Sequence, residues 1–183
     1  MIVSSIPNFL TVFRFFLVYP IVISILEQNY QLTLFFFFIA GVSDYLDGFL
    51  ARKYSWESRF GKIFDPISDK VLVIATLISL SLVGEINIYL TMFLLSRDLF
   101  IIVGVILSSL LIKDYEIRPY FSGKFNSFVL MTYLGFIILE ITFSFVPSLF
   151  LNFLMATLII TSLYSVIEYL IYPGRKVISQ IFF

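Results

Sequence analysis

Apolar runs of about 20 residues recur along the whole sequence, separated by short polar stretches. A helix of that length rises roughly 30 Å, which matches the hydrocarbon core of a bilayer. Hydrophobic residues make up 60% of the 183 positions, compared with roughly 45–50% in soluble domains. The sequence therefore predicts an all-α, polytopic membrane protein in which residues 1–183 form a single membrane domain.

Six segments have the length and composition of transmembrane helices. They are residues 7–26, 31–52, 61–82, 86–112, 124–145 and 148–172. The connections after the first, third and fifth segments contain no Lys or Arg. All 12 basic residues lie on the opposite side or in the half-spans that lead to it. Because basic residues concentrate on the cytoplasmic side, six spans with both termini in the cytoplasm are predicted.

The sequence contains no Cys and no His. Thiolate catalysis, disulfides, Ser–His–Asp triads and His-ligated metal ions are therefore excluded. The formal net charge is zero, so it gives no indication of a nucleic-acid partner, and none is expected. Carboxylates, Lys, Arg, hydroxyls and Tyr remain as the groups that can carry chemistry.

Four aspartates flank the connection between the second and third segments. Asp44 and Asp47 are three residues apart, and Asp65 and Asp69 are four apart. Both spacings place a pair on one face of a helix. Because the two helices are antiparallel about a connection centred near residue 57, Asp47 and Asp65 reach similar depths, as do Asp44 and Asp69. We expect the four carboxylates to converge below the cytoplasmic surface.

Four carboxylates in one place need positive charge among them. Oxygen ligands suit Mg²⁺, Mn²⁺ or Ca²⁺, and two such ions about 3.5–4 Å apart can clamp a phosphoryl transfer. Gly48 and Ala51 leave room for a ligand beside these aspartates, and Arg52 can bind a phosphate. Taken singly, the small residues would indicate close helix packing and Arg52 an interfacial anchor. Together they favour a cleft for a lipid pyrophosphate.

Residues 44–69 resemble the signature of the CDP-alcohol phosphatidyltransferase family. That pattern is D-x-x-D-G-x-x-A-R, eight residues, G, three residues, D, three residues and D. It is matched without departure by Asp44, Asp47, Gly48, Ala51, Arg52, Gly61, Asp65 and Asp69. The six-span layout is similar as well, so the resemblance covers nearly the whole chain.

The resemblance implies an enzyme that moves a phosphatidyl group from CDP-diacylglycerol to an alcohol and releases CMP. The four aspartates would hold two divalent ions, Mg²⁺ or Mn²⁺, and Asp69 would be the general base that deprotonates the acceptor hydroxyl. Gly48 and Ala51 would face the cytidine nucleotide, and Arg52 would contact its phosphates. A homodimer in a bacterial inner membrane, with its active site facing the cytoplasm, is also implied.

Two subgroups of the family differ in the acceptor. IPNFLTVFR at 6–14, ARK at 51–53 and FGKIFDPISDK at 60–70 resemble phosphatidylglycerophosphate synthases, which use glycerol 3-phosphate. SRDLFI at 96–101 and Asn126 resemble the CDP-dependent cardiolipin synthases, which use phosphatidylglycerol. We expect glycerol 3-phosphate as the acceptor, with cardiolipin synthesis as the alternative.

The phosphate of glycerol 3-phosphate would need cations on the cytoplasmic side. Arg97, Arg118 and Lys124 are candidates, although Arg97 and Asp98 are equally well interpreted as a structural ion pair. A cation channel or transporter is the hypothesis from another class. Its acids should be spread across the membrane, whereas these cluster near one side.

Three polar residues lie near the cytoplasmic end of the first segment. They are Asn8, Thr11 and Arg14. They either line the substrate side of the cleft or serve as a helix N-cap and a snorkelling arginine.

Overall fold

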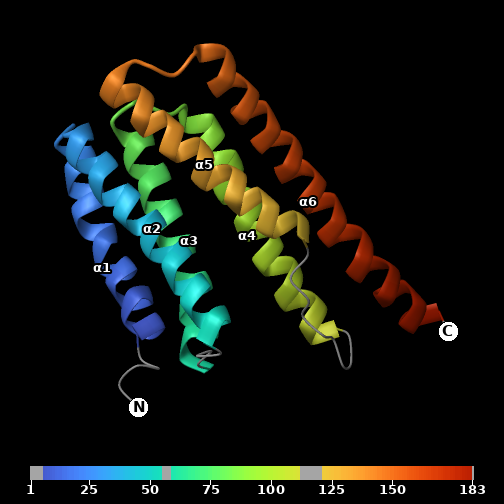
Figure 1. Ribbon diagram of the computed structural model, residues 1–183. Coiled ribbons are helices and arrows are strands. Elements are labelled where there is room, and N and C mark those ends of the chain that lie inside the picture. The colour runs from blue at the N-terminus through green and yellow to red at the C-terminus, as the bar shows by residue number, and fades with distance from the viewer. Residues whose placement is uncertain (1–5, 55–58, 112–120, 183) are drawn as a thin grey trace. The chain divides into compact units, whose positions relative to one another are not determined.

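The computed structural model describes residues 6–54, 59–111 and 121–182, and all the regular structure in these ranges is helical. The helices there are α1 (Ile6–Leu26), α2 (Tyr30–Tyr54), α3 (Arg59–Leu82), α4 (Ile88–Leu111), α5 (Phe121–Phe143) and α6 (Ser148–Phe182) (Figure 1). The predicted all-α fold is confirmed, and every helix boundary but one lies within three residues of its predicted position.

The exception is the end of α6, because the predicted sixth span ends at residue 172. The backbone instead remains helical to Phe182. A proline inside a helix removes one backbone hydrogen bond, and the turns on either side can continue with a kink. The apolar stretch of α6 that could cross a membrane is Ser148–Tyr169, close to the predicted span, and the helix extends beyond it.

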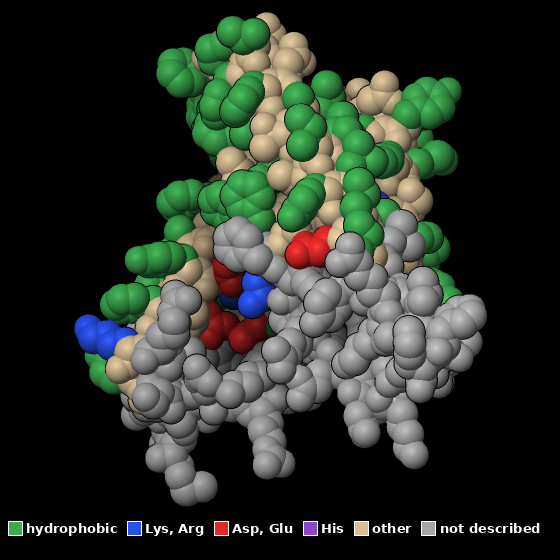
Figure 2. All heavy atoms as spheres, turned by 90° about the vertical axis from the view of Figure 1, so that its right-hand side faces the viewer, with side chains coloured by type: hydrophobic (Ala, Val, Ile, Leu, Met, Phe, Trp, Pro, Cys, Tyr) green, Lys and Arg blue, Asp and Glu red, His purple; other side chains and the backbone are tan. Residues whose placement is uncertain are grey.

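Four of the helices contain stretches that are long and apolar enough to cross a membrane. These are Tyr30–Phe49, Ile88–Leu107, Ser122–Phe143 and Ser148–Tyr169. Large apolar side chains such as Phe16, Phe38 and Leu149 are 67–81% exposed, and hydrophobic side chains cover most of the described surface in Figure 2. The chain is a membrane protein. The count of six spans and the cytoplasmic termini stay predictions.

The chain divides into two compact units, which we describe one at a time. Unit 1 contains Met1–Ile88 and Leu134–Val146, and unit 2 contains Tyr89–Tyr133 and Pro147–Phe183. That both units form one membrane domain stays a prediction.

In unit 1, α1 packs against both α2 and α3 (Figure 1). Residues spaced three or four apart keep to one side of a helix. The buried stripe of α1 has this spacing and consists of Thr11, Arg14, Leu17, Ile21 and Ile25. That of α2 consists of Thr33, Phe37, Ala40, Ser43 and Asp47. Because the helices are antiparallel, the N-terminal end of the α1 stripe meets the C-terminal end of the α2 stripe. Apolar packing along the stripes thus also buries charged residues at one end.

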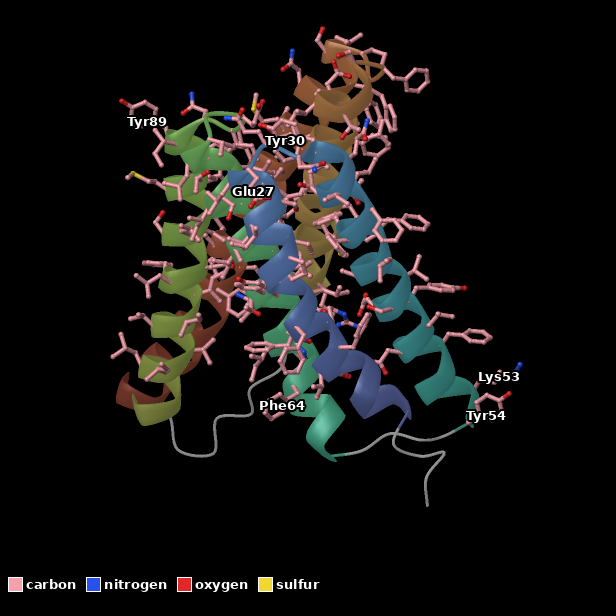
Figure 3. All side chains as sticks on the ribbon, turned by 90° about the vertical axis from the view of Figure 1, so that its left-hand side faces the viewer. Glu27, Tyr30, Lys53, Tyr54, Phe64 and Tyr89 are labelled. Carbon is pink, nitrogen blue, oxygen red and sulfur yellow. The ribbon has the colours of Figure 1, made fainter. Side chains whose placement is uncertain are left out.

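The opposite end of unit 1 is closed by polar contacts. The Asn29 side chain accepts a hydrogen bond from the Leu32 amide at 3.3 Å, which caps the start of α2. Tyr30 donates to Glu85 at 2.8 Å, and Thr142 donates to the Tyr30 carbonyl oxygen at 3.2 Å. Figure 3 shows Tyr30 at the far end of α2 from Lys53. The start of α2 is thereby tied to α5 and to the connection after α3.

Gly84 and Gly104 should respond in opposite directions to substitution by alanine. Gly84 has a φ of +89°, and Gly104 lies inside α4; a Cβ at either position would meet no atom within 4 Å. We expect Gly84→Ala to lower the free energy of unfolding by about 1 kcal/mol, through backbone strain alone. Gly104→Ala should raise it by roughly 0.5–1 kcal/mol, through helix propensity. Unfolding by SDS in mixed micelles measures both, and equal effects of one sign would contradict this explanation.

Candidate active site

The guanidinium of Arg14 lies among aspartates from two helices. Its Nη2 is 3.1 Å from Asp44 Oδ1 and 3.7 Å from Asp47 Oδ2, and its Nη1 donates a hydrogen bond to Asp69. The Arg14 side chain is 1% exposed and that of Asp47 is 4% exposed, whereas those of Asp44 and Asp69 are 46% and 45% exposed. One cation on α1 therefore links α2 and α3 at a site that is closed on one side and open on the other.

Thr11 joins the remaining aspartate to this cluster. Its Oγ1 lies 3.0 Å from Asp47 Oδ2 and also within hydrogen-bonding distance of Asp65. Thr11 thus bridges Asp47 and Asp65, and Arg14 bridges Asp44 and Asp69. These are the two pairs that the spacing places at matched depths. The structure brings all four aspartates together, while their roles as ligands and base stay predictions.

Two of the three polar residues singled out near the start of α1 are buried in the carboxylate cluster. Arg14 is enclosed by ion pairs, so the interpretation as a snorkelling arginine is wrong. Thr11 is 1% exposed and bonds to side chains of the carboxylate cluster. The side chain of Asn8 lies outside the described residues. A substrate-side role for these residues stays a prediction.

The residues of this cluster offer only oxygen atoms besides the arginine. Carboxylate and hydroxyl oxygens are the ligands that hard divalent cations prefer, so the donor set fits Mg²⁺ or Mn²⁺. Within the described part of the chain, no three acidic side chains stand in a ready metal-ligand arrangement. Carboxylate oxygens of the cluster face the Arg14 guanidinium and the Thr11 hydroxyl.

The residues predicted to bind the nucleotide are described only in part. Gly48 is half-buried on α2, next to Asp47. Ala51 and Arg52 lie in the same helix, but their side chains are outside the described residues. On α2 as well, Tyr45 stacks on Phe49 with 6.3 Å between ring centroids, and the Lys53 ammonium lies 5.4 Å from the Phe49 ring centroid.

The predicted acceptor-binding residues have different surroundings. Arg97, in unit 2, is 7% exposed; its Nη1 is 2.5 Å from Asp98 Oδ1 and its Nε donates to Ser165 Oγ at 3.0 Å. The ion pair given as one interpretation of Arg97 is therefore present. Lys124 is exposed on α5, and Arg118 lies outside the described residues. Binding of an acceptor by any of the three stays a prediction.

A second group of polar contacts in unit 2 joins α5 to α6. Asn126 Oδ1 accepts hydrogen bonds from Thr161 and Ser162, both at 2.8 Å, and Ser122 donates to Glu168. These pairings were not predicted from the sequence. Their signal was the spacing of polar residues three or four apart along residues 161–168, which marks one face of α6.

The fold and the carboxylate cluster define an all-helical membrane protein in which four aspartates gather where α1, α2 and α3 meet. Residues 4–167 match the sequence model of the family described as CDP-alcohol phosphatidyltransferase. The chain belongs to this family, which is generally metal-dependent.

Individual relatives match parts of the chain to different extents. The CDP-diacylglycerol–glycerol-3-phosphate 3-phosphatidyltransferase of Haemophilus influenzae is 48% identical over 77 residues, which are 40% of this chain and 42% of that protein. The protein of the same name from Aquifex aeolicus is 34% identical over 140 residues, which are 75% of this chain and 78% of the relative. The cardiolipin synthase (CMP-forming) of Rattus norvegicus is 30% identical over 193 residues, 97% of this chain and 64% of the relative.

Proposed function

We propose that this protein transfers the phosphatidyl group of CDP-diacylglycerol to glycerol 3-phosphate, which yields phosphatidylglycerophosphate and CMP. The observation that carries the proposal is the Aquifex aeolicus relative, whose name states this reaction and which aligns with three quarters of the chain. A relative of the same name from Mycoplasma genitalium, 38% identical over 116 residues, adds support. The gathered aspartates supply chemistry that suits the reaction.

Asp44, Asp47, Asp65 and Asp69 are proposed to hold two divalent cations, Mg²⁺ or Mn²⁺. When bound, these ions would neutralise the pyrophosphate of the lipid nucleotide and stabilise the charge that develops on CMP as it leaves. The half-exposed side chains of Asp44 and Asp69 leave carboxylate surface open for substrate.

Asp69 is proposed to accept the proton of the acceptor hydroxyl. The oxygen so released forms a bond to the phosphorus that carries diacylglycerol, and the bond from that phosphorus to the bridging oxygen breaks, so that CMP leaves. Gly48 and Ala51 would face the cytidine and Arg52 its phosphates. A base held by a second residue keeps its orientation, and the hydrogen bond from Arg14 Nη1 supplies this for Asp69.

For the acceptor phosphate, exposed Lys124 suits the role better than Arg97 does, and Arg118, outside the described residues, stays a candidate. Arg97 already pairs with Asp98 and Ser165, and Lys124 is open to solvent. The bacterial relatives and the one-sided basic residues further support a bacterial inner membrane, with the site facing the cytoplasm. The homodimer is proposed from the family resemblance alone.

Cardiolipin synthesis with phosphatidylglycerol as acceptor is the second candidate. The specific observation in its favour is the Rattus norvegicus relative, which aligns with nearly the whole chain. Asn126 is the residue at which this chain resembles the cardiolipin synthases. It is 2% exposed and accepts a hydrogen bond from Ser162 on α6, so its main contribution is to the packing of α5 against α6.

Release of CMP distinguishes the two candidates. The full chain in detergent micelles is supplied with CDP-diacylglycerol and Mg²⁺, and parallel samples contain glycerol 3-phosphate, phosphatidylglycerol or no acceptor. We expect release that depends on glycerol 3-phosphate and stops when EDTA is added. CMP release only with phosphatidylglycerol would establish cardiolipin synthesis. No CMP release with either acceptor would contradict both candidate functions.

A further inference from the structure

We propose that Arg14 is a built-in competitor of the divalent cations, which limits how tightly the carboxylate site holds them. This inference rests on the proposed function, in which the four aspartates bind those cations. Arg14 would act on the cations indirectly, through the aspartates that it contacts.

The contacts of Arg14 carry the first step. Its two terminal nitrogens face Oδ1 of Asp44, Oδ2 of Asp47 and Oδ1 of Asp69. Carboxylate oxygens of this kind are what a hard cation needs as ligands. An oxygen that directs its lone pairs at a guanidinium is less available to a metal ion, so the two cations compete for the same atoms.

The hydrogen bonding of Arg14 carries the second step. A buried arginine with a purely structural role normally has its donors satisfied, because unpaired buried donors are costly. Arg14 is 1% exposed, yet Nε and Nη2 make no hydrogen bond within the described part of the chain. Among the described residues only Nη1 donates a hydrogen bond, to Asp69, so the guanidinium is incompletely bonded and can shift when a divalent cation binds the same carboxylates.

The charge balance carries the third step. Four ionised aspartates and Arg14 sum to −3, so one divalent cation brings the site to −1 and a second brings it to +1. Without Arg14 the same two cations would leave the site neutral. The second cation is thus disfavoured by Arg14 until the pyrophosphate of the substrate adds negative charge.

Binding of Mn²⁺ alone, followed by electron paramagnetic resonance, tests the inference without any turnover. The full chain in detergent is titrated as wild type, Arg14→Met and Lys53→Met. We expect Arg14→Met to bind Mn²⁺ about tenfold more tightly than wild type, because a positive charge is lost beside the ion. Lys53→Met removes an exposed charge from α2, where Lys53 lies over the Phe49 and Tyr54 rings, and should bind within about twofold of wild type.

Affinity that is unchanged or weaker in Arg14→Met would overturn the inference and leave the proposed cation site intact. Failure of wild type to bind Mn²⁺ at all would instead overturn the cation site, and the inference with it. If Arg14→Met does not fold, Arg14→Gln replaces it. The glutamine amide keeps hydrogen-bond donors but carries no charge, so tighter binding than wild type is expected, and wild-type or weaker affinity would overturn the proposal.

Discussion

Asp69→Asn is expected to reduce CMP release by at least about 10³-fold while the protein still inserts and folds. Loss of a positioned proton acceptor alone costs roughly 10²–10⁴-fold, and an amide is also a poorer ligand for a divalent cation than a carboxylate. The fold should survive, because Arg14 keeps its pairs with Asp44 and Asp47. Turnover at saturating CDP-diacylglycerol and Mg²⁺, with thermal unfolding measured in parallel, gives both quantities.

Glu85→Gln is a suitable control for this substitution. This variant also replaces a carboxylate with an amide in unit 1. Glu85 accepts a hydrogen bond from Tyr30, the first residue of α2. Because Asp47 lies near the other end of α2, Glu85 is far from the carboxylate cluster. We expect activity within about twofold of wild type. Wild-type turnover in Asp69→Asn would show that another group takes the proton and that the ligand set is wrong.

Arg97→Met is expected to lower the free energy of unfolding by about 3 kcal/mol. The substitution removes the cation that faces Asp98 and the donor that bonds Ser165, and a charged group in a bundle of apolar helices is expensive without its partner. The double variant Arg97→Met with Asp98→Leu should recover part of this loss, because both charges are then absent. Unfolding by SDS in mixed micelles measures the free energies of both variants and of wild type.

Lys124→Met serves as the comparison, because Lys124 is exposed on α5 and its loss should change stability by less than about 0.5 kcal/mol. The acceptor hypothesis makes the opposite prediction for Arg97. Arg97→Met could instead unfold like wild type but need far more glycerol 3-phosphate for half-maximal turnover. In that case Arg97 binds substrate, and its ion pair with Asp98 contributes little to the free energy of unfolding.

Much of the fold could be predicted from the sequence, because helix length and lipid exposure leave strong patterns in composition. The apolar runs fixed the positions of the helices within a few residues. The predicted sixth span, residues 148–172, is close to the apolar stretch Ser148–Tyr169. The helix itself continues to Phe182, because a proline removes one backbone hydrogen bond while the turns on either side can continue. The composition of a span therefore does not show where its helix ends.

The carboxylate site was predictable as four aspartates at matched depths but not as a complete set of contacts. The spacing on α2 and α3 determined which aspartates pair. It did not reveal that Arg14 and Thr11 lie between them, since that depends on how α1 is rotated against its neighbours. One signal was present. Thr11 and Arg14 continue the spacing of Leu17, Ile21 and Ile25, so the apolar stripe predicts a buried arginine, which in a membrane requires acidic partners.

All the residues of the carboxylate cluster come from α1, α2 and α3, between Thr11 and Asp69. Every side chain of the cluster therefore precedes α4 in the chain and is synthesised before it. The acidic half of α3 would be a poor candidate for insertion by itself, but it enters the bilayer beside an α1 that carries its counter-charge. Biogenesis of this protein thus has a natural order, in which the charges of α1, α2 and α3 can neutralise one another before α4 to α6 are synthesised.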